Sequence, residues 1–273
     1  MRPGIFTKVF IRPTLGDVLD AVASHGIEVV QFNLASAALP SLPEELTDDQ
    51  CATIRGEFER RRIIPAILSA TFNIIHPSLA AREAGFHSFE VLACAARRIG
   101  AEILSVSTGT LDAHDMWRKH PGNDSPEAWR EMVDSVGKLT SIAAKYRVTV
   151  AFEPEQGNIV DTPRKARLLL DTVGSAQLRV VIDAANLLNL SNLALQDGVL
   201  REAFEILGQD IVAAHAKEFS ADGKLGGRAL GRGNVNFPLY LSLLRQMGTP
   251  VPVILHGFAE DEVEESLEYL AGA

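Results

Sequence analysis

Residues 178–218 read LRVVIDAANLLNLSNLALQDGVLREAFEILGQDIVAAHAKE, and this stretch decides the fold class. Two short apolar runs, 178–183 and 211–217, each have the length of a buried strand. Between them, the segment near 198–207 has apolar residues at helical spacing. A strand, a helix and a second strand in this order predict parallel strands joined by a crossover helix.

The same alternation runs along the whole chain. Strands are predicted at 5–10, 28–33, 64–72, 102–107, 149–153, 178–183, 211–217 and 251–255. Helices are predicted at 14–25, 48–61, 79–99, 126–146, 162–173, 198–207, 237–247 and 261–270. Eight such units without a Gly/Ser-rich linker predict an α/β fold, a single (β/α)8 barrel domain over residues 1–273. The competing fold, an open doubly wound sheet, would leave edge strands to cover.

The net charge, the length of the apolar runs and the cysteine spacing disfavour several classes of protein. The net charge is −9, which disfavours nucleic acid as a partner because surfaces that bind it are basic. No apolar run approaches the roughly 18 residues of a membrane span, and the N-terminus lacks a signal-peptide pattern. Cys51 and Cys94 have neither metal-site nor disulfide spacing, as expected of buried thiols in a reducing compartment. We therefore expect a cytoplasmic protein with no membrane partner.

Polar residues end four successive predicted strands. Each follows an apolar run: Glu153, Asp183, His215 and His256. In a (β/α)8 barrel these ends surround one mouth, where active sites lie. Poorly hydrated carboxylates there would repel one another, and a divalent cation would offset that cost. Mixed oxygen and imidazole ligands suit one Mn²⁺, the expected ion, and also Co²⁺, Zn²⁺ or Mg²⁺.

Each of these residues also has an ordinary structural interpretation. Asp183 alone could cap the following helix, and His215 alone could be a hydrogen-bonded core histidine. Lys217 could be a solvated or ion-paired side chain. The hypothesis of one shared metal site depends on the four strand ends taken together.

Four segments carry a resemblance to a known family. They are AFEPEQGN (151–158), VVIDAANLL (180–188), HAKE (215–218) and ILHGFAEDEVEESLEYL (254–270). In order and spacing they resemble the xylose-isomerase-like TIM-barrel superfamily of sugar (phosphate) isomerases and epimerases. The resemblance implies a small-molecule carbohydrate substrate and an enzyme that removes a proton next to a carbonyl, with an enediolate intermediate. It also implies that one metal is held by Glu153, Asp183, His215 and His256, with Glu153 and His256 catalytic.

Two positions depart from the family pattern. Ketose 3-epimerases of this superfamily carry glutamate where this chain has His256, which can bind a metal or carry a proton but supplies no negative charge. They often carry a substrate-binding histidine where this chain has Asn186. The reaction type is therefore open between isomerisation and dehydration of a keto-cyclitol of the inosose type.

Further candidates for substrate binding surround the predicted mouth. Glu155, Lys217 and Asn186 follow the strand ends directly, and His76 and Trp117 lie on loops after the third and fourth strands. His76 has an equal alternative as a turn residue before Pro77, and Trp117 as a loop anchor. The glycine-rich stretch 226–237, with Arg228 and Arg232, is either a phosphate cradle or a flexible connection.

Two other functions share the barrel. A DNA-repair endonuclease of the endonuclease IV type would need more histidine ligands and a basic face, against the seven histidines and net charge of −9 here. A non-catalytic sugar-binding barrel would need neither metal nor base. The resemblance also implies a homodimer or homotetramer.

Overall fold

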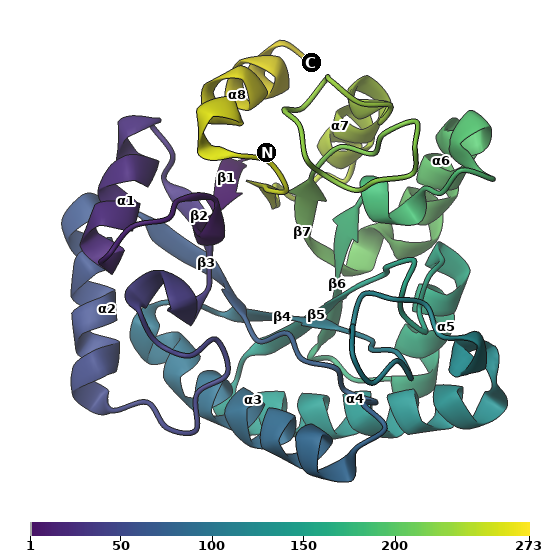
Figure 1. Ribbon diagram of the computed structural model, residues 1–273, viewed down its shortest axis with the longest axis horizontal. Helices are drawn as coiled ribbons and strands as arrows, with labels where there is room; N and C mark the ends of the chain where they lie inside the picture. Colours follow the sequence, from purple (N-terminus) through teal and green to yellow (C-terminus); the bar gives the residue numbers. More distant parts are fainter. Residues whose placement is uncertain (1) are drawn as a thin grey trace.

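Eight parallel strands close into a barrel, which confirms the predicted fold class (Figure 1). The computed structural model describes residues 2–273. Each strand pairs with the next along the chain, and the first pairs with the last. The strands are Arg2–Phe6 (β1), Val29–Phe32 (β2), Ile64–Ser69 (β3), Ile103–Ser107 (β4), Thr149–Glu153 (β5), Leu178–Asp183 (β6), Ile211–Ala216 (β7) and Pro252–Leu255 (β8).

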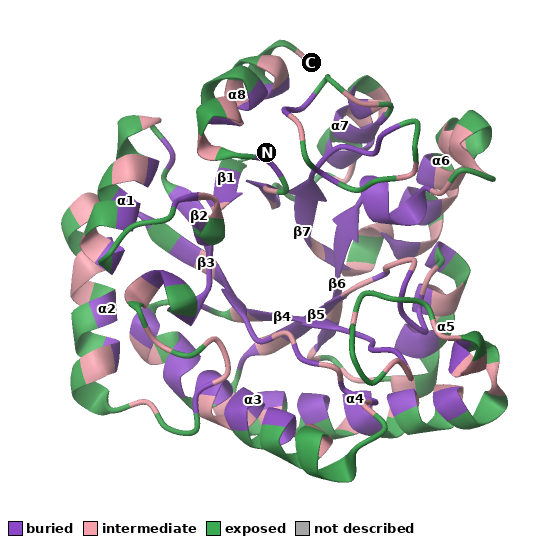
Figure 2. Cartoon of the chain, in the orientation of Figure 1, coloured by how far each residue is buried: buried purple, intermediate pink, exposed green. Residues whose placement is uncertain are grey.

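Eight helices alternate with these strands and form the outer ring seen in Figure 1. They are Leu15–Ser24 (α1), Asp48–Arg61 (α2), Leu79–Ile99 (α3), Pro126–Tyr146 (α4), Pro163–Val173 (α5), Gln196–Leu207 (α6), Phe237–Gln246 (α7) and Val263–Gly272 (α8). Their buried sides face the barrel and their exposed sides face outward (Figure 2). The apolar side chains between helices and sheet form the larger core cluster.

Side-chain caps set the start of several helices. The hydroxyl of Thr14 accepts the backbone N–H of Asp17 at 3.1 Å at the start of α1. At α2, Thr47 and Gln50 form a reciprocal capping box. These bonds satisfy amide groups that the first helical turn leaves without a partner.

The first strand differs from its prediction. We predicted a strand over 5–10, but β1 covers Arg2–Phe6, and Thr7–Val9 form a 3₁₀ helix. A strand continues only while its neighbours offer pairing, and the last pairs of β1 are with Leu255 of β8 and Gln31 of β2. Beyond them the hydroxyl of Thr7 accepts the N–H of Asn33, which ties the turn to the end of β2.

The barrel interior is built in two layers. The lower layer is apolar and consists of Val29, Ile67, Ala151, Val181, Ala213 and Ile254. Two residues further along the same chain segments stand Gln31, Ser69, Glu153, Asp183, His215 and His256. Because side chains two apart on a strand share a face, the second layer lies above the first, toward the C-terminal mouth. The polar strand ends therefore rest on a packed apolar floor.

Among residues 2–273, no helix has the length and apolar character needed to cross a lipid bilayer.

Candidate active site

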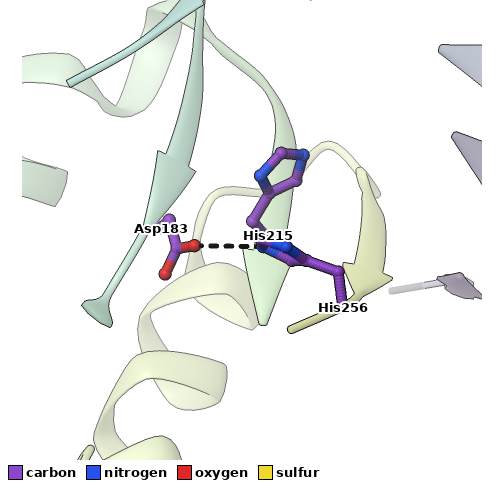
Figure 3. A group of neighbouring side chains, drawn as sticks. All are labelled: Asp183, His215 and His256. Carbon is purple, nitrogen blue, oxygen red and sulfur yellow. Dashed lines mark hydrogen bonds and ion pairs between the residues drawn. The ribbon is translucent and has the colours of Figure 1, made fainter. Parts of the chain in front are cut away.

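Asp183, His215 and His256 come together at the C-terminal mouth of the barrel. Figure 3 shows the carboxylate of Asp183 at the end of β6, the ring of His215 on β7 and that of His256 just after β8. One ligand atom from each residue lies within 4.8 Å of the others. The two imidazole rings meet edge to face, with centroids 4.7 Å apart. Three of the four predicted strand ends thus form a group that could coordinate one cation.

The carboxylate of Asp183 is the buried centre of this group. Its Oδ1 accepts the backbone N–H of Ala185 at 2.9 Å, which fixes the carboxylate plane. Its Oδ2 lies 3.3 Å from Nε2 of His256 and 3.4 Å from Nζ of Lys217. Asp183 is fully buried, and a charge in that position requires such partners. Lys217 supplies a positive charge, and His256 a ring nitrogen.

The fourth strand end, Glu153, lies beside His215. Its Oε2 is 3.1 Å from Nδ1 of His215, and its Oε1 accepts the side-chain N–H of Asn186 at 2.5 Å. The Nδ1 atom of His215 is buried, yet among the described residues it has no partner with hydrogen-bond geometry. The 3.1 Å approach is therefore an electrostatic contact. Glu153 therefore lies beside the group of Asp183, His215 and His256 and contacts it through His215.

These residues fit a divalent metal ion. The donor set contains two carboxylates and two imidazoles and no thiolate, which is the chemistry of catalytic rather than structural sites. The unpartnered Nδ1 of His215 is the specific observation in favour, because a buried polar atom without a partner needs an explanation.

Opposite charges within this group shift the pKa values of its members toward their charged forms. Burial would raise the pKa of Asp183, but attraction by Lys217 and His256 outweighs it and holds the pKa below its usual value. Burial would lower the pKa of His215, but the charge of Glu153 outweighs it and raises the pKa. The pKa of Lys217 is raised in the same way by the carboxylates around it. In the metal-free protein, the buried ammonium of Lys217 thus offsets the charge of the carboxylates.

The pKa values of His256 and Glu155 are shifted toward the neutral forms of these groups. Burial lowers the pKa of His256, with a further lowering by the charges of His215 and Lys217, although the hydrogen bond to Asp183 opposes it. Burial also raises the pKa of Glu155 to about 8, helped by repulsion from Glu153. At neutral pH His256 is therefore an unprotonated imidazole, and Glu155 is mostly a neutral carboxylic acid.

A cavity of about 410 Å³ opens above the polar layer. Among the predicted site residues, Glu153, Glu155, His215, Lys217, His256 and Trp117 line it. Asn186 contributes indirectly, through its bond to Glu153. The other lining residues come mainly from the first four βα units and are Phe6, Lys8, Gln31, Asn33, Ser41, Ser69, Thr71, Ser105, Val106, Ser107 and Met116.

His76 is not among the residues that line this cavity. One of its ring nitrogens lies 3.1 Å from the carbonyl oxygen of Ala113, and the other accepts the N–H of Ser78. Both nitrogens are thus used in holding loops together. The arrangement matches the turn interpretation of His76 rather than substrate binding.

The position of Trp117 depends on a close backbone approach. A Cβ atom on Gly157 would lie 1.9 Å from the carbonyl oxygen of Trp117, so only glycine allows the loops after β4 and β5 to pack this closely. Asn158 donates to the carbonyl of Met116, and Asn123 donates to that of Gly157. These bonds hold Met116 and Trp117 at the cavity.

The glycine-rich stretch 226–237 is folded around a buried carboxylate. Glu218, fully buried, accepts the N–H groups of Gly231 at 2.6 Å and of Val235 at 3.3 Å. Arg232 pairs with Glu265 on α8. The Gly231 amide and the Arg232 guanidinium are therefore already engaged inside the protein, which favours the structural interpretation of the loop over a phosphate cradle.

Sequence reasoning missed Gln31, Ser69 and Ser105, which stand in the polar layer on the opposite wall. Gln31 and Ser69 are each the one polar residue of a strand, and Ser105 shares its strand with Ser107, so these polar residues within apolar strands were the available signal. It also missed Tyr240 of α7, whose hydroxyl bonds to the carbonyls of Ile182 and His215 and ties β6 to β7 beneath the site.

Residues 19–273 match the family described as xylose isomerase-like TIM barrel. The chain belongs to this family. Within it, the probable L-ribulose-5-phosphate 3-epimerase UlaE of Mycoplasma pneumoniae is 26% identical over 188 residues. That match covers 67% of this chain and 55% of the relative, so the chain spans about half the relative's length.

Two solved structures superpose on the whole chain. The apo form of 3-keto-D-glucoside 4-epimerase YcjR from E. coli has a TM-score of 0.79 at 14% identity, with complete coverage of both chains. The IolI protein with a bound zinc atom has a TM-score of 0.71 at 18% identity and covers 100% of this chain and 96% of its own. At these identities the likeness shows the shared fold.

Proposed function

We propose that this protein is a divalent-metal-dependent isomerase or epimerase of a sugar or sugar phosphate. The observation that carries the proposal is the convergence of Asp183, His215 and His256, with Glu153 beside His215 and the buried Nδ1 of His215 left without a hydrogen-bond partner among the described residues. The family to which the chain belongs and the name of its UlaE relative support a ketose as the class of substrate.

The four proposed ligands would hold the ion through Asp183, Glu153, Nδ1 of His215 and a ring nitrogen of His256. A bound divalent ion supplies positive charge that stabilises the oxyanion formed when a sugar carbonyl is enolised. Mn²⁺ is our first expectation because the donor set mixes oxygen and nitrogen, and Co²⁺, Zn²⁺ and Mg²⁺ are the alternatives.

The proton transfers would be divided between two carboxyl groups. Glu153 has a lowered pKa and is ionised at neutral pH, so it is suited to remove a proton from the carbon next to the carbonyl. Glu155 lines the same cavity with a pKa of about 8, so it is suited to return a proton to the enediolate. His256, unprotonated at neutral pH, is better suited to bind the ion than to donate a proton.

Lys8 supports a substrate with an anionic substituent. Lys8 and Lys217 are the basic residues that line the cavity. Lys217 is paired with Asp183, whereas Lys8 is exposed and makes no ion pair among the described residues. A phosphate at the outer end of the sugar would reach Lys8, and a Lys8→Ala variant should then raise KM for a ketose phosphate but not for the free ketose.

The test is proton exchange in D₂O. The purified protein, loaded with Mn²⁺, is incubated with a panel of free and phosphorylated ketoses, and deuterium incorporation is followed by NMR. We expect deuterium at a carbon next to the carbonyl of one substrate, lost in Glu153→Gln. A protein that binds no divalent metal and exchanges no ketose would overturn the proposal.

A dehydratase of a keto-cyclitol is the second candidate, favoured by the neutral acid Glu155 beside the cavity. After the same first proton abstraction, Glu155 would protonate a leaving hydroxyl, so water is lost and an enone forms. Enone absorbance together with loss of water from the product mass would identify this reaction. A sugar-binding barrel without catalysis would instead bind its ligand unchanged in the presence of a chelator and in Glu153→Gln.

A further inference from the structure

The ring of His215 is held from the side opposite to Glu153. Its Nε2 lies 2.7 Å from Oε1 of Gln31, a residue of β2 on the other side of the barrel and 184 positions away in sequence. Both residues are 4% exposed, so water does not compete for this bond. Gln31 is therefore the fixed hydrogen-bond partner of one ring nitrogen, while the other faces the proposed metal ligands.

The amide of Gln31 is itself oriented by two hydroxyl groups. Its Nε2 donates to Oγ of Ser69 at 3.1 Å and to Oγ of Ser105 at 3.3 Å. These two bonds use both N–H groups of the amide and turn its oxygen toward His215. An amide oxygen only accepts, so the nitrogen of His215 that faces it carries the proton.

This pattern determines which nitrogen of His215 is available to a metal. With the proton on Nε2, the neutral imidazole has its lone pair on Nδ1, the buried atom that has no hydrogen-bond partner among the described residues. We propose that Gln31 is a positioning residue: it fixes the tautomer and ring plane of His215 so that Nδ1 points at the bound ion. This inference rests on the metal site of the proposed function.

His256 has no comparable support. Nε2 of His256 lies 3.3 Å from Oδ2 of Asp183, which is another proposed ligand. Within residues 2–273, no hydrogen bond to Nδ1 of His256 is found. The two histidines thus differ. His215 has a hydrogen-bond partner, Gln31, that is not a proposed ligand, whereas the ring of His256 bonds to the proposed ligand Asp183. Loss of Gln31 should act through His215 alone.

Zn²⁺ binding to the full-length protein tests this inference. We would compare Gln31→Met, which keeps the length of the side chain but removes the acceptor, with Gln31→Glu, which keeps an acceptor. Thr7→Val is the matched control, because Thr7 is a buried polar residue near the mouth whose hydroxyl bonds to Asn33 and Ser36 and which does not line the cavity. Affinity is measured by competition with a chromophoric chelator, and thermal unfolding of the metal-free proteins by circular dichroism checks folding.

We expect Gln31→Met to bind Zn²⁺ about 10- to 100-fold more weakly, the usual effect of removing a partner that orients a metal-bound histidine. Gln31→Glu should restore the affinity, and Thr7→Val should leave it unchanged. The absorption bands of bound Co²⁺ should shift in Gln31→Met and not in Gln31→Glu, which a general loss of stability would not produce.

Three outcomes would overturn the inference, and they are distinguishable from one another. Equal Zn²⁺ affinity in the native protein and a folded Gln31→Met removes the role of Gln31 and leaves the metal site intact. Equal weakening in Gln31→Met and Thr7→Val shows that the effect is general. A native protein that binds no divalent metal removes the proposed function together with the inference.

Discussion

Nε2 of His256 lies 3.3 Å from Oδ2 of Asp183, although β6 and β8 are not neighbours in the barrel. The strand between them, β7, presents His215 to the same point. The curvature of the barrel wall thus points the side chains of three successive strand ends toward one place. In a flat sheet with the same strand order, side chains on one face would project in parallel and would not converge.

His256 is the residue whose replacement tests the altered ligand set most directly. His256→Ala removes one proposed ligand, so metal affinity should fall by more than the roughly 100-fold that loss of an outer partner costs. His256→Glu supplies the carboxylate that ketose 3-epimerases carry here and should retain binding. Isothermal titration with Mn²⁺ measures both. Unchanged affinity in His256→Ala would show that His256 is not a ligand.

The pair Asp183–Lys217 should behave as a buried ion pair in the metal-free protein. Asp183→Asn leaves the ammonium of Lys217 buried without its carboxylate, so the free energy of unfolding should fall by about 3–5 kcal/mol. The double variant Asp183→Asn, Lys217→Met should recover a large part of that loss. Urea unfolding with a chelator present gives these values. Additive losses in the double variant would contradict the pairing.

Glu155 should make the metal-free protein less stable as the pH rises. Its pKa is 4.5 in the unfolded chain and about 8 in the fold, so between these values the folded state keeps a proton that the unfolded state has lost. The stabilisation is complete below pH 4.5 and disappears as the pH rises through 8. Replacing Glu155 by Gln should flatten the fall in Tm across this window. An identical pH profile in the two proteins would show that Glu155 is not buried as an acid.

Gly157 should control the position of Trp117. A methyl group at Gly157 meets the carbonyl oxygen of Trp117, so Gly157→Ala should cost about 1–3 kcal/mol and displace the loop after β4. The accessibility of Trp117 to acrylamide quenching and the rate of proteolysis in 108–124 should both increase. Gly137→Ala on α4 is the control, because its methyl group meets nothing within 4 Å and should stabilise the helix slightly. A Gly157→Ala protein with native stability and quenching would be evidence against this packing.

The fold and the meeting of Asp183, His215 and His256 could be predicted from the sequence because strand periodicity indicates both. An apolar run that ends in Asp183 or His215 indicates a buried strand, and it also places a polar side chain at the C-terminal end of that strand. Glu155 was a candidate because it follows the end of this strand directly, although β5 ends at Glu153 and strand parity does not extend to it. The first strand was displaced because its end depends on where β8 and β2 stop, which is a property of the closed sheet.

There is a physical reason why the residues on the other wall of the site could not be predicted. Gln31, Ser69 and Ser105 are polar residues whose role depends on hydrogen bonds of Gln31 to both serines and to His215 across the barrel. No local pattern encodes such a meeting, because the partners lie on different strands. The contact of His76 with the carbonyl oxygen of Ala113 was likewise not predictable, since Ala113 belongs to another loop.

The most direct test of the central claim is a crystal structure of the protein loaded with Zn²⁺, with anomalous diffraction at the zinc edge. We predict one anomalous peak at the barrel mouth, about 2.0–2.2 Å from oxygens of Glu153 and Asp183, from Nδ1 of His215 and from a ring nitrogen of His256. A peak at another place, or no peak at a concentration of Zn²⁺ that saturates related sites, would contradict the account.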